Sequence, residues 1–392
     1  MQYCKQCVYP VVAVNLVLNE GVCSACQSAN EAISGEVDWA GREEEFRALA
    51  ERIRRNNSRD YDCVIPVSGG KDSYFQTHLA IEYGLKPLLV TYHGNNYLPE
   101  GDYNRDRMRE VFDADHLVMG PSVSVLKKMN RLGFRKTGDM NWHAHCGIFT
   151  YPMQAAVRFE VPIVLWGEVP WDISGMHSVH DRVEFSNRTR REHGLRGYDW
   201  PDFVGDEIDN LSEKDLLWAK YPSDDEILRV GLRGLYIGNY FPWEANLHTQ
   251  MMIDLYGWKP AEQEFERTYR TMSNLDDRYE NGIHDLMKFV KFGYGRASDH
   301  ASKDIRAGLM TRAQGLEMVR KYDAVVSSDL DHWLNYVGMN EEEFWKIADT
   351  FRDPRIWSIE NGRWMKDTLW GKVEDFGEVR IPESEWQKYI RN

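Results

Sequence analysis

The chain has 392 residues, enough for one large domain or two to three smaller ones around a sizeable apolar core. Its 62 acidic and 48 basic side chains give a formal net charge of −14, so a nucleic-acid partner would require a strong local basic patch. No window approaches the roughly 18 uninterrupted apolar residues of a membrane span, and the first residues contain no basic region followed by an apolar core. We therefore expect a cytoplasmic protein that binds neither nucleic acid nor membrane.

Four of the six cysteines form two C-x2-C pairs, separated by fifteen residues, near the start of the chain. Each pair can form a tight knuckle, and two knuckles with converging thiolates complete a tetrahedral Zn²⁺ site. Residues 12–18 can form a strand and residues 19–21 a turn, so residues 1–35 are predicted to be a zinc ribbon. A redox role is the alternative for a C-x2-C pair, especially one that opens a helix. The predicted metal ligands are Cys4, Cys7, Cys23 and Cys26.

A helix is predicted within residues 36–60, because Trp39, Phe46, Leu49 and Ile53 recur on one helical stripe. We interpret this segment as a linker helix between the ribbon and the body of the protein.

The stretch 61–81, YDCVIPVSGGKDSYFQTHLAI, passes from an apolar run through a glycine turn into a helical pattern. Residues 62–67 are rich in β-branched side chains and predict a buried parallel strand. The helical pattern continues from Tyr74 until Gly84 ends it. This order of strand, turn and helix directs backbone N–H groups and the positive helix end at one spot, which suits a phosphate group.

The loop S-G-G-K-D-S resembles the PP-loop of the ATP pyrophosphatase superfamily, whose members cleave ATP between the α- and β-phosphates and adenylate an oxygen of their substrate. A Walker A loop is excluded by Ile65 and Asp72, and no G-x-G-x-x-G fingerprint is present. A lysine adds positive charge, and the aspartate must face Mg²⁺ or a backbone donor. A plain glycine turn without a ligand is the alternative. The predicted nucleotide-binding residues of the loop are Val67, Ser68, Gly69, Gly70, Lys71, Asp72 and Ser73.

Further strands are predicted at 87–94, 115–120 and 161–168, with a helix at 102–113. Residues 61–245 are therefore expected to form an open parallel α/β sheet of PP-loop ATP pyrophosphatase type, similar to the adenine nucleotide alpha hydrolases, with insertions. Nucleotides bind beyond the carboxyl ends of such strands. By resemblance, residues near the adenine would be Thr91, Tyr92 and His93, and those near the ribose or phosphates would be Gly147 and Glu168.

Residues 172–246 are rich in aromatic, charged and glycine residues and are expected to be insertions over the sheet rather than another strand and helix. Their arginines could bind the diphosphate or a carboxylate of a sugar nucleotide, or belong to a solvated loop. The arginines concerned are Arg188, Arg190, Arg191 and Arg196.

Residues 246–392 are expected to be mainly helical. Gly257 ends one helix, capping patterns at Thr311 and Asn340 begin two others, and Pro354 stops the last.

Residues 291–306, KFGYGRASDHASKDIR, place two glycines before an arginine and the start of a helix. This pattern indicates either an anion site or a glycine bend before a capped helix. The predicted substrate-binding residues here are Tyr294, Arg296 and His300.

Three segments in this order, at 4–26, 67–73 and 287–312, resemble the N-acetyl sugar amidotransferases, a PP-loop family of bacterial surface-polysaccharide pathways. The resemblance implies conversion of an acetamido group on a nucleotide-activated sugar into an acetamidino group, within lipopolysaccharide and O-antigen synthesis. It implies ATP, Mg²⁺ and Zn²⁺ as cofactors and a separate glutaminase subunit as the source of ammonia. The predicted catalytic residues are Lys71, Asp72, Glu168 and His143, with His145 a further candidate for proton transfer.

Two alternative functions share parts of this pattern. A tRNA sulfurtransferase would have the same loop and ribbon, but only Cys63 and Cys146 remain outside the predicted zinc site. Cys63 fits a core position, and Cys146 is either packed or reactive. A non-enzymatic assembly protein that senses ATP is the second alternative. The sequence leaves open the sugar, its reacting ring position and whether the chain forms a homo-oligomer.

Overall fold

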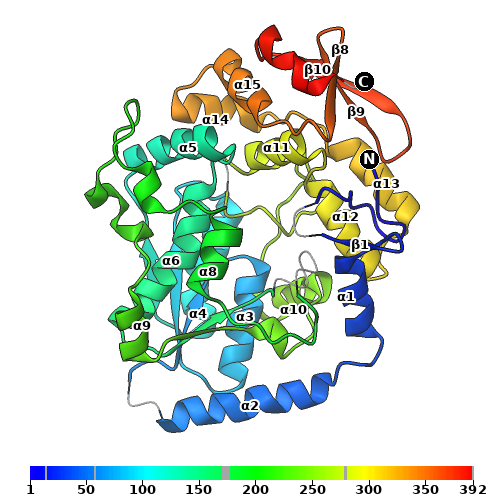
Figure 1. The fold of residues 1–392 in the computed structure, drawn as a ribbon. Coiled ribbons are helices and arrows are strands. Elements are labelled where there is room, and N and C mark those ends of the chain that lie inside the picture. The colour runs from blue at the N-terminus through cyan, green and yellow to red at the C-terminus, as the bar shows by residue number, and fades with distance from the viewer. Residues whose placement is uncertain (14–15, 57–58, 170–176, 278–279, 391–392) are drawn as a thin grey trace.

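The main sheet is five-stranded and wholly parallel, with the strand order β5-β4-β3-β6-β7. It lies in the part of the protein labelled α3, α4 and α6 in Figure 1. The computed structural model describes residues 1–13, 16–56, 59–169, 177–277 and 280–390. The predicted α/β fold class and the four strands indicated by apolar runs are confirmed. The strands are β3 (Cys63–Pro66), β4 (Pro87–Tyr92), β5 (His116–Met119), β6 (Ile163–Trp166) and β7 (Arg233–Tyr236).

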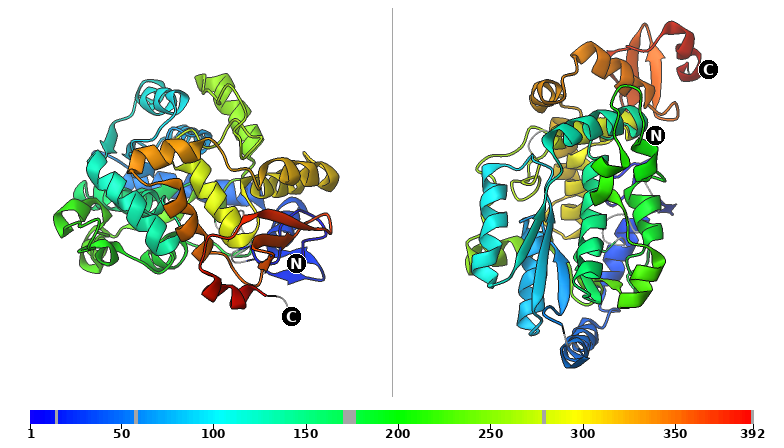
Figure 2. Two further views of the ribbon diagram at one scale, coloured as in Figure 1. Left: turned by 90° about the horizontal axis from the view of Figure 1, so that it is seen from above. Right: turned by 90° about the vertical axis from the view of Figure 1, so that its left-hand side faces the viewer.

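Helices cover both faces of this sheet, which gives three layers (Figure 2). Ile65 and Leu89 pack in a core with α2, α3, α4 and α10, whereas Val64 and Val90 pack against α6 on the opposite face. Successive strand residues point to opposite faces, so burial on both sides requires the continuous apolar runs seen in the sequence. These helices are α2 (Trp39–Asn56), α3 (Lys71–Glu82), α4 (Pro99–Phe112), α6 (Trp142–Arg158) and α10 (Ala245–Tyr256).

The fifth strand lies where the sequence predicts insertions only, so that expectation is wrong for residues 224–236. Helix α9 (Asp224–Val230) leads into β7, which pairs in parallel with β6. Because β7 has only four residues and begins with Arg233 and Gly234, it lacks a recognisable apolar run. The short helical segments nearby are α8 (Asn187–Thr189), the π-helical turn η1 (Arg190–Gly194), η2 (Trp200–Phe203), η3 (Glu213–Ala219) and η4 (Ile237–Asn239).

The C-terminal part is mainly helical, as expected, but it also contains a small antiparallel sheet that the sequence pattern does not predict. Helices α11, α14 and α15 pack against α5. The sheet, in the order β10-β9-β8, buries Trp357 and Trp364 beside Phe289 of α11. The elements are α5 (Val123–Thr137), α11 (Asn281–Phe292), α12 (Arg296–Arg306), α13 (Arg312–Tyr322), α14 (Asp329–Val337), α15 (Glu341–Thr350), β8 (Trp357–Glu360), β9 (Arg363–Asp367), β10 (Val373–Glu378) and η5 (Glu383–Tyr389).

The N-terminal segment has less strand than its sequence predicts. The strand expected over residues 12–18 is reduced to β1 (Leu18–Asn19), which pairs with β2 (Val22–Cys23) around the predicted turn. Residues 14–15 lie outside the described residues. Helix α1 (Ser24–Ile33) follows directly, and the segment lies beside α12 and α13 (Figure 1). Within the described ranges, no helix has both the length and the apolar character needed to cross a membrane.

Candidate functional site

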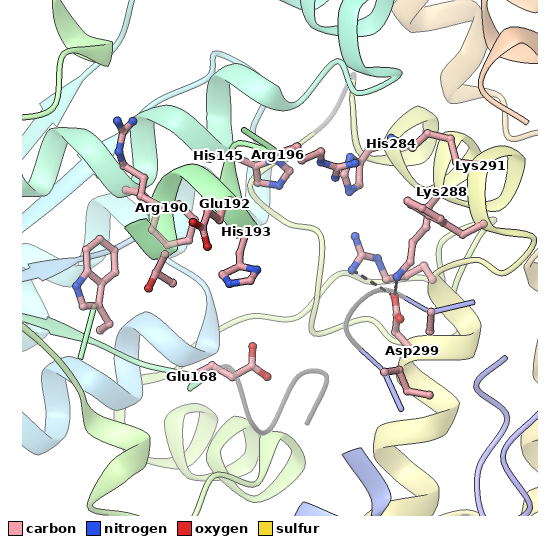
Figure 3. A pocket seen from close by; sticks show the side chains of 18 of the residues that line it. His145, Glu168, Arg190, Glu192, His193, Arg196, His284, Lys288, Lys291 and Asp299 are labelled. Atoms are coloured by element: carbon pink, nitrogen blue, oxygen red, sulfur yellow. Dashed lines mark hydrogen bonds and ion pairs between the residues drawn. The ribbon is translucent and has the colours of Figure 1, made fainter. Parts of the chain in front are cut away.

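Two adjoining cavities lie beyond the carboxyl ends of β3, β4 and β6. The loop cavity, of about 400 Å³, is lined by the turn after β3, including Ser68 and Asp72. The basic cavity, of about 820 Å³, extends from there towards α11 and the N-terminal segment (Figure 3). The residues that line both cavities, and so form their shared wall, are His145, Phe149, Trp166, His284 and Arg296.

The turn between β3 and α3 has the backbone geometry of an anion cradle. Gly69 adopts a positive φ of 84°, and a Cβ atom there would lie 2.5 Å from the backbone nitrogen of Arg105. The Trp258 indole donates a hydrogen bond of 2.9 Å to the Gly69 carbonyl, and the Ser68 N–H donates one of 2.9 Å to Ser73 Oγ. Gly70 is the N-cap residue of α3, and no side chain caps the first N–H groups of this helix. The first N–H groups of α3 can therefore bind an anion in the loop cavity.

Charged side chains at this turn fit a magnesium-bound phosphate. Lys71 is 8% exposed, and its Nζ lies 2.5 Å from Asp72 Oδ2. Asp72 Oδ1 is buried and has no hydrogen-bond partner among the described residues. Asp276, which also lines the loop cavity, has its pKa raised by burial, although a hydrogen bond from Ser68 opposes this shift. Asp72 and Asp276 would hold Mg²⁺, which proteins typically bind through one or two carboxylates together with substrate phosphates.

The other predicted nucleotide-binding residues divide into two groups. Val67, Ser73 and Tyr92 line the loop cavity, together with Gly94 and Asn96, which the sequence did not single out. The side chains of Thr91 and His93 line neither cavity. Thr91 Oγ1 donates to the Val67 carbonyl at 2.5 Å, and His93 Nδ1 accepts from the Asn95 N–H at 2.8 Å. Both side chains therefore bond to backbone groups near the end of β4 and do not form part of the cavity wall.

Gly147 lines neither cavity, and its surroundings indicate a packing role, while the predicted contact with ribose or phosphate stays a prediction. It lies on α6, where a methyl group would overlap the ring of Tyr92 on β4. The glycine therefore sets how closely α6 can approach the sheet beneath the loop cavity.

Gly147→Ala is expected to lower the free energy of unfolding by about 1–2 kcal/mol, because overpacking costs typically 1–3 kcal/mol and alanine recovers up to about 1 kcal/mol of helix propensity. Urea unfolding followed by circular dichroism measures this. If stability stayed unchanged and only the affinity for ATP fell, the original prediction of a nucleotide contact would be correct and the packing role wrong.

His143, a predicted catalytic residue, lies in the core and lines neither cavity. It is 0% exposed, with Nδ1 3.0 Å from the Tyr92 hydroxyl and Nε2 3.1 Å from the Glu280 carboxylate. Glu168, predicted to lie near the nucleotide, lines the basic cavity rather than the loop cavity and forms an ion pair with Lys303. His145, two residues after His143, reaches the wall that both cavities share.

Positive side chains from α11 and the start of α12 dominate one side of the basic cavity (Figure 3). Lys288 forms an ion pair with Asp299, and Arg296 Nε lies 2.8 Å from Asp285. Lys291 donates hydrogen bonds to the Thr137 and Gly138 carbonyls at the end of α5, while burial lowers its pKa to about 7. This cavity can therefore accept an anionic substrate, with acidic groups interspersed.

Of the predicted substrate-binding residues, Tyr294 and Arg296 line the basic cavity. His300 lies behind them, with Nδ1 2.5 Å from Thr268 Oγ1, and it lines neither cavity.

The four arginines of residues 188–196 have different surroundings. Arg188 and Arg191 are exposed. Arg190 lines the basic cavity but is 1% exposed, with its guanidinium 2.7 Å from Asp199. Arg196 lines the same cavity and lies 3.0 Å from Asp139. Arg188 and Arg191 thus fit the solvated-loop alternative, whereas binding of a sugar nucleotide by Arg190 and the exposed Arg196 stays a prediction.

The four N-terminal cysteines form a candidate metal centre. All are 0% exposed, and their sulfur atoms lie within 4.8 Å of one another. The sulfur–sulfur distances of 3.9 Å for Cys4 and Cys26 and 3.7 Å for Cys7 and Cys23 fit a tetrahedron whose Zn–S bonds are about 2.3 Å. The second pair opens α1, but the convergence of four thiols favours Zn²⁺ over the redox alternative.

The N-terminal segment also forms part of the basic cavity, which the sequence did not predict. Tyr9, Ala13 and Leu16 line the cavity, and the Tyr9 hydroxyl donates a hydrogen bond of 2.9 Å to Asp299. Arg312 of α13 donates to the Cys7 carbonyl at 3.1 Å. The metal centre therefore supports one wall of the cavity.

Comparison with known proteins gives a match for the part of the chain that includes α11 and α12. Residues 264–369 match the family model described as "LPS biosynthesis protein WbpG-like, C-terminal domain". No curated protein matches the chain. The matched residues supply Asp276, His284, Lys288, Lys291 and Arg296 to the two cavities. Residues 264–369 are thus similar to a WbpG-like C-terminal domain, which supports the resemblance to an amidotransferase family of surface-polysaccharide biosynthesis.

Proposed function

We propose that this chain is an ATP-dependent amidotransferase of lipopolysaccharide biosynthesis. It adenylates the acetamido oxygen of a nucleotide-activated N-acetyl sugar, and ammonia then replaces that oxygen to give an acetamidino sugar, AMP and pyrophosphate. The observation that carries this proposal is the shared wall between the loop cavity and the basic cavity. An enzyme that joins two substrates must hold their reacting atoms next to each other, and two adjoining cavities would allow this.

The loop cavity, together with Lys71 of the adjoining turn, which lines neither cavity, would supply the groups for cleavage of ATP. The uncapped start of α3 and the ammonium group of Lys71 would neutralise charge on the phosphates, and Asp72 and Asp276 would hold Mg²⁺. When bound, Mg²⁺ supplies charge neutralisation on the phosphates. The amide oxygen attacks the α-phosphorus, and the bond to the pyrophosphate oxygen breaks. Positioning and charge neutralisation, rather than a protein nucleophile, perform this step.

The basic cavity supplies the binding site for the sugar nucleotide. Lys288, Lys291 and Arg296 face a volume of about 820 Å³, which suits a ligand larger than a simple sugar. Ammonia enters from free ammonium in an assay or from a separate glutaminase subunit.

A sulfurtransferase has no comparable support in the structure. Cys63 and Cys146, the cysteines outside the metal centre, are both 0% exposed, and Cys146 Sγ lies 3.8 Å from Thr150 Oγ1 in the core. Burial raises the pKa of the Cys146 thiol to about 12, which disfavours the nucleophilic thiolate.

The test follows the amide oxygen. Purified protein, magnesium ATP and ammonium are combined with UDP- and CMP-linked acetamido sugars whose acetamido oxygen is ¹⁸O. We expect AMP and pyrophosphate to form only with a particular sugar, the AMP phosphate to gain the label, and the sugar to exchange oxygen for NH. Unlabelled AMP, or AMP formed with tRNA and a sulfur donor in place of any sugar, would contradict the proposal.

A further inference from the structure

The wall shared by the two cavities contains two imidazoles. Of its five residues, His145 and His284 carry the imidazole rings, whose unprotonated nitrogen can accept a proton, whereas the Arg296 guanidinium only donates. The shared wall is where an adenylated sugar carbon would lie, between the phosphate cradle and the sugar-binding side chains. Attack by ammonia on that carbon requires removal of a proton from the incoming nitrogen.

Asp139 orients His284. The carboxylate is 1% exposed, and its Oδ1 lies 2.8 Å from His284 Nδ1. Because an ionised carboxylate only accepts hydrogen bonds, Nδ1 carries the proton and Nε2 is left as the acceptor. Arg196 lies 3.0 Å from Asp139 Oδ2, and His145 Nδ1 lies 3.6 Å from the same oxygen. The carboxylate thus stays ionised among cationic and polar neighbours, in a position that fixes the ring of His284.

The surroundings keep His284 neutral and able to accept a proton. Burial lowers the pKa of His284, Asp139 opposes this shift, and His145 and Arg296 add to the lowering. Burial alone would raise the pKa of Asp139, but His284 and Arg196 hold it well below its usual range. This pairing of a neutral imidazole with an ionised carboxylate is the arrangement that general-base histidines require.

The geometry points to His284 as the general base of the amidotransfer step, with Asp139 as its positioning residue; this assignment rests on the proposed function. The ammonia nitrogen forms a bond to the adenylated carbon, and the carbon–nitrogen π electrons of the imidate move onto its nitrogen. Nε2 takes one proton from the new –NH₃⁺ group. The carbon–oxygen bond then breaks, its electron pair leaves with AMP, the amidine forms, and the proton passes from His284 to solvent.

The experiment separates adenylation from amidotransfer. His284→Asn keeps a donor towards Asp139 but has no basic nitrogen, and Asp139→Asn keeps the shape of the carboxylate without its charge. His332→Asn, on the exposed surface of α14, is the matched control. For each protein, sugar-dependent exchange of labelled pyrophosphate into ATP is measured without ammonia, and amidino-sugar formation is measured with saturating ammonium from pH 6 to 9.

We expect His284→Asn to keep pyrophosphate exchange within about twofold and to lose amidino-sugar formation by about 10²–10⁴-fold, the usual contribution of a general base. The remaining rate should rise with pH beyond the wild-type plateau, and added imidazole should restore part of it. Asp139→Asn should also lower the pKa of His284 measured by NMR on histidine-labelled protein without substrates, because the carboxylate stabilises the imidazolium.

Three outcomes would overturn the assignment. Unchanged product formation in His284→Asn would show that another group takes the proton. Equal losses of exchange and product in both His284→Asn and Asp139→Asn would assign the pair to adenylation or to folding. Wild-type protein without sugar-dependent exchange or product would instead contradict the proposed function, and the role of His284 with it.

Discussion

Asp72→Asn is expected to reduce sugar-dependent AMP formation by at least about 10²-fold, the usual scale when one transition-state stabilising group is removed. The variant takes a charge away from the loop cavity, where Asp72 Oδ1 is buried without a hydrogen-bond partner among the described residues. Lys71→Ala should have an effect of similar size, because the Lys71 ammonium is the positive charge that α3 contributes at the turn. AMP released at saturating ATP and sugar measures both.

Controls distinguish this result from a loss of folding. Both variants should keep the metal content and the thermal midpoint of the wild type, since the metal centre lies on a different part of the chain. Glu82→Gln, at the exposed far end of α3, should leave AMP formation unchanged. Normal turnover in both Asp72→Asn and Lys71→Ala would refute the assignment of the loop cavity to ATP.

Cys7→Ser is expected to abolish binding of Zn²⁺ and to weaken the basic cavity, the proposed sugar site, more than the loop cavity, the proposed nucleotide site. Structural zinc contributes apparent binding energies of about 10–16 kcal/mol, so the segment around the metal centre should lose its order. Tyr9 would then no longer donate to Asp299 in the basic cavity. The metal content, the KM for the sugar and the affinity for ATP are measured together, the last by equilibrium binding.

Two further variants sharpen this test. Tyr9→Phe removes only the hydroxyl that bonds to Asp299, so the KM for the sugar should rise about tenfold while the zinc content stays constant, as hydrogen bonds to charged groups contribute about 1.5–3 kcal/mol. Cys63→Ala, in the buried strand β3, should leave the metal content unchanged. Full zinc content in Cys7→Ser would rule out the proposed metal centre.

Local patterns predicted the parts of the site that are continuous in sequence. The strand, the glycine turn and α3 could be expected because an apolar run, a positive-φ glycine and a helical pattern follow one another within about twenty residues. Strand β7 could not be predicted from local patterns, because its pairing with β6 depends on a partner some seventy residues earlier rather than on its own composition. The sheet β8–β10 likewise depends on packing against α11.

Local sequence patterns also do not show which histidines belong to the site. His143 and His145 stand in one short segment, and the chemistry of an isolated imidazole does not distinguish them. On α6 they project in different directions, so His143 bonds to Glu280 in the core while His145 reaches both cavities. His284 was missed because its partner Asp139 is 145 residues away in sequence. A carboxylate that meets an imidazole so far along the chain leaves no local signal.

The docking of the N-terminal segment has a consequence for how the protein is made. Its four cysteines all lie within the first 26 residues, but Tyr3, Tyr9 and Cys7 bond to Asp367, Asp299 and Arg312. A ribosome that adds about 5–20 residues per second needs on the order of tens of seconds to reach these partners. Throughout that interval the nascent knuckles have only the metal and the hydrogen bonds within their own segment, such as that from the Lys5 N–H to the Gly21 carbonyl, to hold them together. Zinc supply during translation, rather than afterwards, would therefore decide how much of the newly made protein acquires a complete basic cavity.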